Sequence, residues 1–570
     1  MHLLDHLDTW TAAIETRSTA GRGSSNKLNL YGIKKLRELI LELAVRGQLV
    51  AQDPQDEPAS VLLKKIAAEK ARLIKDGKLK KQAPLPPITD DEKPFELPEG
   101  WEWVRFGDVT VNRDGERKPV SSSDRQNMQG EYDYYGASGV IDQVNGYLFD
   151  KPLLLIGEDG ANLINRSTPI AFIATGKYWV NNHAHVIDGV SLDFLRYLEL
   201  FINAISLESY ITGTAQPKMN QAKMNSIPIA IPPETEQHRI VAKVNELMSL
   251  CDALESEQAS NINAHQVLVE NLLSALANAA DQGNFQQTWA RIAAHFDTLF
   301  TTEHSIDQLK QTILQLAVMG KLVAQNPQDE PASVLLKKIV TEKARLVKAG
   351  KIKKQEPLPP INDDEKPFEL PEGWEWTRLV GVLALVTDGD HQAPPKSDSG
   401  IPFLVIGNLN SGKVLLDGCR FVPINYYKKL DWGRQPQKYD LLYTVTGSYG
   451  IPITVDVDDA FCVQRHVAIL KATESTPINY LFYLLRAEYA FDYATSIATG
   501  IAQKTVPLTG LRKMPIAVPP LEEQHRIVAK VDELMTLCDQ IKVRIRTAQT
   551  TQLHLADALA EQAIVGTNPV

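Results

Sequence analysis

The chain has 570 residues, of which 44% are hydrophobic and 23% are charged, and its formal net charge is −10. This length suggests three or four folding units, and the composition is ordinary for a globular protein. The acidic balance argues against a protein whose whole surface binds nucleic acid, but it does not exclude a local basic face.

The sequence shows no pattern typical of a membrane span, a signal peptide or a set of disulfides. No apolar run approaches the roughly 18–20 residues that span a bilayer, and the first residues, MHLLDHLDTW, lack the pattern of a signal peptide. Four cysteines in 570 residues do not make a disulfide framework. These features predict a reduced, cytoplasmic protein.

Internal repetition organises the sequence. Residues 43–105 align without a gap to residues 316–378, and 52 of the 63 positions are identical. Within this repeat the stretch DDEKPFELPEGWEW occurs twice without any change, at 90–103 and at 363–376, an offset of 273 residues. Such a repeat must be identified before any fold is assigned, because each copy forms the same structural unit.

A second repeated segment has a different offset. IPIAIPPETEQHRIVAKV begins at Ile227, and MPIAVPPLEEQHRIVAKV begins at Met514, 287 residues later. A shorter echo, TGTAQ and TGIAQ, shares this offset. The chain therefore consists of near-identical frames around two inserts, at about 104–226 and 377–513, and the second insert is fourteen residues longer.

Each frame contains predicted helices. Apolar residues at steps of three and four predict one helix over about 30–50, with a counterpart at 306–323. A lysine-rich helix should run from Pro58 to about Asp76, and from Pro331 to about Ala349, before a proline-rich tether. Its lysines Lys64, Lys65, Lys78, Lys80 and Lys81 either contact DNA phosphates or form a solvated face.

A long helix follows each insert, over about 234–275 and 521–563. Its apolar residues recur at steps of four and three, which is the seam of a coiled coil or a helical hairpin. Glutamates in the first turn suit the positive end of the helix dipole. The predicted seam residues, which are also the candidate spacer and partner-docking residues, are Ile240, Val244, Leu247, Leu254, Ile527, Val531, Leu534 and Ile541. Cys251 and Cys538 occupy seam positions and are expected to be small buried apolar residues.

The inserts are predicted to be α+β domains. In the first insert, strand-like runs at 151–157, 168–174 and 177–187 precede a helix near 191–208. The second insert has the same order of elements, with strand-like runs at 401–407, 440–446, 452–457 and 461–470 before a helix near 477–492. One fold with two sets of loops is therefore expected.

The loops of the inserts carry side chains that suit base edges, since Arg and Lys pair with guanine and Asn and Gln with adenine. Neither insert is strongly basic, so an ordinary surface loop is the competing explanation for each residue. The candidate DNA-binding residues are Asn112, Arg113, Arg117, Lys118, Asn181, Asn182, Lys218, Asn220, His391, Gln392, Arg434, Lys438, Gln464, Arg465, Gln503 and Lys504.

The sequence contains no convincing catalytic or metal-binding motif. GNLNSGKV at 407–414 has the spacing of a phosphate-binding loop, but Val414 replaces the hydroxyl that holds Mg²⁺. His183 and His185 share one strand face, yet no neighbouring sequence pattern supplies further metal ligands. Glu158 and Asp159 lack a partner lysine at nuclease spacing. No catalytic residue, metal or cofactor is therefore expected.

Two divergent inserts, two long helical repeats, TGxAQ before each helix and IPxPPxxEQHRIV at each helix start together resemble the specificity subunit of type I restriction–modification enzymes, from about residue 29 to residue 563. The resemblance implies that each insert is a target recognition domain for one half of a split, asymmetric DNA site. It also implies that the helices space these domains and dock two modification (methyltransferase) subunits, which restriction (helicase-nuclease) subunits join. Adenine methylation, ATP hydrolysis and cleavage would belong to those partners, so the chain itself would not be an enzyme.

The implied architecture is two α/β target recognition domains separated by long antiparallel helical repeats, with pseudo-two-fold symmetry. Helix 30–50 would pair with 521–563, and helix 306–323 with 234–275. The expected domains are an N-terminal helical repeat and tether (1–103), recognition domain 1 (104–233), a central repeat and tether (234–376), recognition domain 2 (377–520) and a C-terminal repeat (521–570).

Two other functions stay open at this level. The chain could be a self-contained DNA methyltransferase or nuclease with an unrecognised site, which would bind S-adenosylmethionine or cut DNA when purified alone. It could instead be a scaffold that joins proteins through coiled coils, which would show no preference for any DNA sequence.

Overall fold

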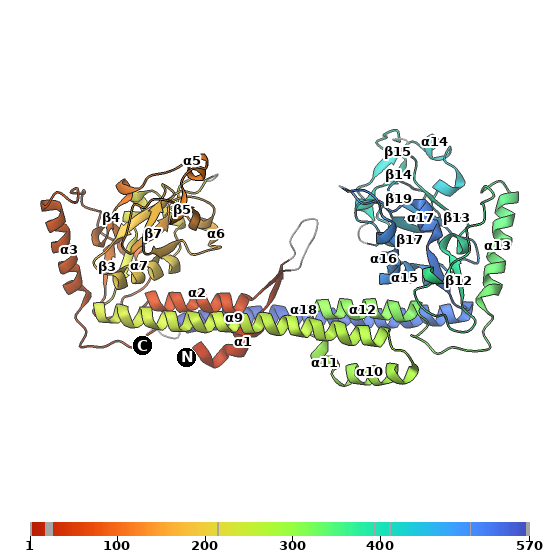
Figure 1. Ribbon diagram of the computed structural model, residues 1–570, viewed down its shortest axis with the longest axis horizontal. Coiled ribbons are helices and arrows are strands. Elements are labelled where there is room, and N and C mark those ends of the chain that lie inside the picture. The colour runs from red at the N-terminus through yellow and green to blue at the C-terminus, as the bar shows by residue number, and fades with distance from the viewer. Residues whose placement is uncertain are drawn as a thin grey trace. The chain divides into compact units, whose positions relative to one another are not determined.

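The computed structural model divides the chain into two compact units, and each unit holds one insert (Figure 1). Unit 1 comprises residues 1–262 and 548–570, and unit 2 comprises residues 263–547. The structure describes residues 3–17, 27–213, 216–391, 394–409, 412–501 and 503–565. Among these residues, none of the helices combines the length and apolar character needed to cross a lipid bilayer.

Two long helices contribute residues to both units: α9 (Glu234–Ala277) and α18 (Leu521–Val565). The other helices of unit 1 are α1 (Leu7–Ala12), α2 (Tyr31–Val45), α3 (Ala59–Lys75), α4 (Phe106–Val109), α5 (Ser122–Gln126), α6 (Asn162–Asn165), α7 (Leu192–Ala204) and α8 (Gln221–Asn225). Its strands are β1 (Glu15–Arg17), β2 (Lys27–Asn29), β3 (Glu102–Arg105), β4 (Val111–Asn112), β5 (Gln129–Gly136), β6 (Gly139–Val144), β7 (Leu153–Gly157), β8 (Ala171–Ala174), β9 (Tyr178–Val180), β10 (Ala184–Asp188) and β11 (Pro228–Ile231).

Unit 2 repeats this arrangement with its own elements. Its helices are α10 (Gln282–Ala294), α11 (Phe296–Leu299), α12 (Glu303–Val318), α13 (Ala332–Lys348), α14 (Ile424–Tyr427), α15 (Ile478–Arg486), α16 (Glu488–Ile497) and α17 (Leu508–Lys513). Its strands are β12 (Glu375–Arg378), β13 (Leu385–Asp388), β14 (Ile401–Leu404), β15 (Arg420–Val422), β16 (Leu441–Thr444), β17 (Pro452–Thr454), β18 (Cys462–Val463), β19 (Val467–Lys471) and β20 (Pro515–Val518).

The predicted helices of the frames are present, although α2 and α12 each end five residues before the predicted ends at 50 and 323. The lysine-rich helices α3 and α13 each end two residues before a glycine, Gly77 and Gly350, and both glycines have φ of +70°. Glycine adopts this left-handed conformation without the steric cost that a side chain would add, so it ends a helix well. The long helices begin at the predicted positions and extend two residues beyond the predicted ends.

The predicted pairing of the short helices is present but incomplete. Helix α2 packs against α18 and α12 against α9, as predicted, and each short helix also packs against the other long helix. In unit 1, Arg37 of α2 donates to Asp252 of α9 (2.5 Å), while Tyr31 of α2 donates to Asp557 of α18 (2.7 Å). The reason is the width of the apolar stripe on α2, whose buried residues are Gly32, Ile33, Leu36, Leu39, Ile40, Leu43, Ala44 and Val45. A stripe of this width covers more than one partner helix.

Unit 2 has the same three-helix packing. Lys542 and Arg546 of α18 pair with Asp307 (2.9 Å) and Glu303 (2.6 Å) of α12. The end of α9 joins the same hydrophobic core, where Val269 is buried with residues of α12. Ala556, which follows Val269 by 287 positions, is buried in the corresponding place in unit 1.

The predicted seam residues lie inside the protein. Ile240, Val244 and Leu247 are buried in the core of unit 1, and Ile527 and Val531 are buried in the core of unit 2. The remaining three are half-buried against the same cores: Leu254, Leu534 and Ile541. These side chains therefore hold the chain's own helices together, and a partner protein can reach only the outer faces of those helices.

The two inserts have one fold, as the order of their predicted strands suggested. Unit 1 has an antiparallel sheet of order β4-β10-β7-β8, and unit 2 has an antiparallel sheet of order β13-β19-β16-β17. A second sheet has the order β6-β5-β9 in unit 1 and β15-β14-β18 in unit 2, and each contains one parallel pair. The strand order and direction are therefore repeated even though the inserts share little sequence.

Each insert begins and ends at one two-stranded ribbon. Strand β3 pairs with β11, with Glu102 opposite Ile231, and β12 pairs with β20, with Glu375 opposite Val518. The chain enters the domain from the tether and leaves it into the long helix at the same place. Each domain is therefore joined to its frame through adjacent strands.

Candidate nucleic-acid interface

The tryptophan near the end of each tether fastens the tether to the first turn of a long helix. Trp101 Nε1 donates to Glu236 Oε2 at 3.0 Å, and Gln52 donates to the other carboxylate oxygen at 2.7 Å. Trp374 donates to Glu523 at the same distance of 3.0 Å. Both glutamates are 1% exposed, and burial raises the pKa of each carboxyl.

An arginine at the end of β3 and of β12 binds the middle of each tether. Arg105 makes two hydrogen bonds of 2.7 Å to Glu92, and it also donates to the Ser226 carbonyl at the far end of the insert (2.6 Å). Arg378 repeats the paired bond with Glu365. The hydrogen bonds from these arginines lower the pKa of Glu92 and of Glu365 to about 2. Two-pronged bonds of this kind fix direction as well as distance.

A lysine on the lysine-rich helix holds that helix against the recognition domain. Lys70 Nζ donates to the carbonyl oxygens of Gly107 (2.7 Å) and Thr110 (2.9 Å), at the end of α4. Lys343 donates to the Val380 carbonyl at 2.8 Å. Burial lowers the pKa of Lys70, and it lowers the pKa of Lys343 to about 8. These two lysines cannot be recognised from the sequence, because nothing in their spacing separates them from their exposed neighbours.

Many of the candidate DNA-binding residues of unit 1 lie at one end of the four-stranded sheet. This end, called the loop edge here, is formed by residues 113–118, 158–159 and 181–183 and by the described residues of 212–218. Arg117 donates to the Ala184 carbonyl at 2.7 Å, and the backbone of Lys218 bridges to Asp159. The fold thus brings together loops that are up to about a hundred residues apart in the chain.

Unit 2 has an equivalent loop edge, formed by residues 389–391, 445–447 and 464–466 and by 499–505, within the described part of the chain. The backbone of Asp390 bridges to Gln464, and Gly447 N donates to the Lys504 carbonyl at 3.0 Å. Arg434 reaches this edge by donating to Asp390 at 2.9 Å. The side chains at the two edges differ, although the backbone segments correspond.

A polar cluster lies behind the loop edge of unit 1. His185 Nδ1 lies 2.6 Å from Asp114, and Asp114, Glu158 and His185 offer ligand atoms within 4.8 Å of one another. The sequence did not show these carboxylates beside His185, because they come from other strands. Arg117 and Lys218 lie 2.8 Å and 3.1 Å from Glu158, so two cations already neutralise the carboxylates.

The charges of this cluster stabilise one another. Burial is the largest single influence on Asp114 and would raise its pKa, but the hydrogen bond and charge of His185 and the hydrogen bonds that involve Val186 and Asn112 together lower it. Burial is also the largest single influence on Glu158 and opposes its ionisation, but Arg117, His185 and Lys218 together leave its pKa lowered. The arrangement is a rigid, charge-balanced support for the surrounding loops.

Several other candidates have local structural roles. Asn112 and Asn181 accept hydrogen bonds from the backbone of Asp114 and His183, and Asn220 caps α8 by accepting from Lys223 N. Arg113 pairs with Glu116 at 2.7 Å, and His391 pairs with Asp388 at 3.0 Å. Lys118, Asn182, Arg465, Gln503 and Lys504 are exposed.

One described candidate lies away from the loop edge of unit 2. Lys438 precedes β16 and pairs with Asp458 at 2.8 Å, which places it at the opposite end of the sheet. Gln392 lies outside the described residues.

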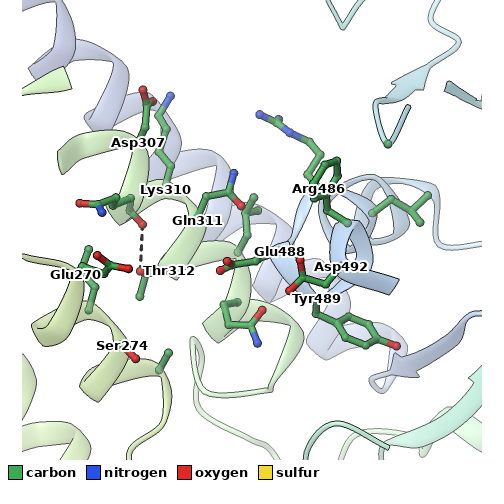
Figure 2. A pocket seen from close by; sticks show the side chains of 18 of the residues that line it. Glu270, Ser274, Asp307, Lys310, Gln311, Thr312, Arg486, Glu488, Tyr489 and Asp492 are labelled. Carbon is green, nitrogen blue, oxygen red and sulfur yellow. Dashed lines mark hydrogen bonds between the residues drawn. The ribbon is translucent and has the colours of Figure 1, made fainter. Parts of the chain in front are cut away.

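Unit 2 also contains a cleft of about 1220 Å³ between its helices and its recognition domain, shown in Figure 2. Helices α9 and α12 form one wall and α15 and α16 the other. The charged side chains that line it are Glu270, Asp307, Glu488, Asp492, Lys310 and Arg486. Acidic groups outnumber basic ones, so this cleft does not suit a DNA backbone.

Comparisons with known proteins agree on one family. A family model described as the type I restriction modification DNA specificity domain matches residues 98–264 and 371–548. The specificity subunits of the type I restriction enzymes EcoEI and EcoAI from Escherichia coli are 41% and 42% identical to the chain, and each alignment covers 99% of both proteins. The MjaVIII specificity subunit from Methanocaldococcus jannaschii is 22% identical and covers 80% of this chain and 92% of that protein.

The family match therefore takes in both inserts together with the start of the long helix that follows each of them. The similarity to the EcoEI and EcoAI subunits extends over both recognition domains and both helical frames. The chain belongs to the family of type I restriction enzyme specificity subunits, which are DNA-specificity components rather than enzymes.

Proposed function

We propose that each recognition domain reads one half of a bipartite, asymmetric DNA target, with domain 1 at 104–233 and domain 2 at 377–520. The observation that carries this proposal is the contrast between the two units. Their strand order and their tether contacts are the same, while the side chains at their loop edges differ. Two recognition domains that are held by the same contacts but carry different side chains at their loop edges suit a protein that reads two different DNA sequences.

The exposed residues of the loop edges are the best candidates for base contacts. In unit 1 these are Lys118, Asn182 and Lys218, and in unit 2 they are His391, Arg465, Gln503 and Lys504. Arg113, Arg117 and Arg434 are tied to carboxylates and would position the loops. Each wrong base pair typically costs about 1–3 kcal/mol, so a few such contacts per domain give useful discrimination.

The helical regions, at 1–103, 234–376 and 521–570, would set the spacing between the two half-sites. Their outer faces would dock two modification subunits, and restriction subunits would join that core on double-stranded DNA in the cytoplasm. The chain contains two nearly identical helical frames, and two similar surfaces would each bind one copy of the same modification subunit.

An exchange of recognition domains tests the proposal. Residues 377–513 would be replaced by the corresponding insert of a relative, and methylated adenines would be mapped in cells that also produce the modification and restriction subunits. The expected result is a target with one half changed and the other half kept. A target changed in both halves, or an undivided target in the unaltered protein, would contradict the proposal.

A further inference from the structure

The positive charge of this acidic protein is concentrated in two short segments. Residues 59–81 contain eight Lys and Arg against two acidic residues, and residues 332–354 contain eight against one. The two segments therefore carry +13 between them. Because the whole chain carries −10, all its other residues together carry −23. A basic stripe of this kind on an acidic protein marks contact with a polyanion.

These basic segments consist of α3 with the turn after it, and α13 with the turn after it. One face of each helix is apolar and buried, through Ala59, Leu62 and Ile66 in α3. Helical geometry places the exposed residues Lys64, Lys65, Arg72 and Lys75 on the opposite face. Lys78, Lys80 and Lys81 follow and are also exposed.

The counterparts in unit 2 are the same residue types 273 positions later: Lys337, Lys338, Arg345, Lys348, Lys351, Lys353 and Lys354, all exposed. Two exposed, uncharged neighbours differ between the copies, since Ala67 and Ala68 correspond to Val340 and Thr341. Asp76 corresponds to Ala349, which makes the second segment more basic.

The buried lysine of each helix determines how the basic face is presented. Lys70 binds carbonyl oxygens at the start of recognition domain 1, and Lys343 does so in domain 2. Figure 1 shows α3 and α13 each lying along a flank of the recognition domain in its own unit. The orientation of each basic face relative to its recognition domain is therefore fixed by these contacts.

Few acidic groups compete for these cations. Lys65 lies 3.5 Å from Glu57, Arg72 pairs with Glu69 at 2.6 Å, and Lys338 pairs with Glu330 at 3.0 Å. Such exposed pairs contribute little, about 0–1 kcal/mol, so a phosphate can displace them.

We propose that α3 with residues 76–81, and α13 with residues 349–354, bind the phosphate backbone of DNA next to each half-site without reading its sequence. The inference rests on the proposed function, because it assumes that DNA lies against the recognition domains. It explains why the two basic segments agree while the loop edges differ. Phosphate contacts position a protein on any duplex, whereas base contacts must differ between two half-sites.

The test uses the full chain assembled with its modification subunits. One variant carries Lys64→Gln, Lys65→Gln and Lys75→Gln together with Lys337→Gln, Lys338→Gln and Lys348→Gln. Fluorescence anisotropy would give the Kd for a duplex with the mapped target and for an unrelated duplex, between 50 and 200 mM salt. The matched control carries Lys93→Gln and Lys366→Gln, which are tether lysines already paired with Asp90 and Asp363 at 2.7 Å.

The expected result is an equal loss of affinity for both duplexes, on the order of tenfold or more, with a shallower salt dependence. Each lost phosphate contact should reduce the slope of log K against log salt by roughly 0.9. The control variant should keep the wild-type slope, and the methylated sequence should not change.

Two results would overturn the inference. One is a wild-type slope in the six-lysine variant. The other is loss of the modification subunits from that variant in gel filtration, which would identify the basic segments as a protein-docking surface. Failure of the proposed function would look different, because the wild-type complex would then bind both duplexes equally well.

Discussion

Trp101 and Glu236 are joined by a buried hydrogen bond of 3.0 Å from the indole Nε1 to the carboxylate, across 135 residues of sequence. Trp374 and Glu523 are joined in the same way at the same distance. In both units a tyrosine ring, Tyr197 or Tyr480, lies edge-on to the tryptophan. The relationship locks a tether, a recognition domain and a long helix together at one point.

Loss of the indole donor should destabilise this junction. Trp101→Phe leaves the buried Glu236 without one of its donors, and an unsatisfied buried acceptor costs about 1–3 kcal/mol. Hydrogen exchange should therefore become faster in the first turns of α9, while the first turns of α18 in the same molecule serve as the internal reference. Trp374→Phe should instead make hydrogen exchange faster in the first turns of α18, with α9 as the internal reference.

A double variant separates this bond from simple loss of packing. Trp101→Phe combined with Glu236→Gln should cost less than the sum of the two single changes, because the residues contact each other. Trp103→Phe is the matched control, since Trp103 is half-buried against Phe95, 5.1 Å away between ring centroids. Additive costs in the double variant would show that the hydrogen bond has no energetic role.

The buried ion pair of unit 2 should be more sensitive to loss of one partner than of both. Lys471 Nζ lies 2.6 Å from Asp440, both side chains are almost fully buried, and the ammonium lies 4.4 Å from the Trp432 ring centroid. Asp440→Asn should destabilise unit 2 by about 3–5 kcal/mol, because it leaves an unpaired buried charge. Adding Lys471→Met should recover part of that loss.

Urea titration followed by hydrogen exchange in β16 and β19 would measure these effects within unit 2. Lys366→Met, which removes an exposed ion pair in the same unit, should change stability by less than about 0.5 kcal/mol. A single-variant loss as small as that of the control would mean that water compensates the lost partner.

Glu199 should make the stability of unit 1 depend on pH. Burial raises the pKa of Glu199 to about 7 from its usual value of 4.5. Between those two pH values the folded protein holds a proton that the unfolded chain has released, so stability falls as pH rises through the window. Glu199→Gln should remove that fall and stabilise unit 1 at pH 8, on the order of 1–3 kcal/mol.

Thermal unfolding of the wild type and the variant at pH 4.5 and pH 8 would check this dependence. The two proteins should be closer in stability at pH 4.5 than at pH 8. Glu208→Gln, at an exposed position of the same unit, should leave the pH dependence as in the wild type. An unchanged pH dependence in Glu199→Gln would contradict the prediction.

The outer faces of the long helices should bind the modification subunits. Leu268 of α9 and Leu555 of α18 are each 51% exposed, and they are 287 positions apart, so both copies of the frame present the same leucine. Burial of a leucine side chain contributes about 1.5–3 kcal/mol. Leu268→Asp with Leu555→Asp should weaken binding of the modification subunit by about tenfold or more in calorimetric titration.

The control for this surface is Val543→Asp. Val543 is 61% exposed on α18, but Ser256 occupies the corresponding place on α9, so the side chain is not part of a repeated surface. Equal weakening by the control and by the leucine variant would assign the effect to added charge instead of to lost contact.

The helices and the repeated plan could be predicted from the sequence, because both depend on local patterns. Apolar steps of three and four residues identified α9 and α18, and Gly77 and Gly350 marked the ends of α3 and α13. Family membership followed from the same repeats. Each of these signals lies within a few turns of chain, where neighbouring residues alone determine the geometry.

The sites depended on contacts between distant residues. Glu236 was predicted to favour the start of a helix dipole, but the fold made it a buried acceptor for a tryptophan from the tether. His185 met Asp114 across 71 residues, and Lys70 met the carbonyl oxygens of α4, because strand order brought those loops together. The short helices found two partners because the width of an apolar stripe does not specify which surfaces cover it. Periodicity along one segment determines its own shape, whereas the choice among distant partners depends on how all segments bury their apolar surface together.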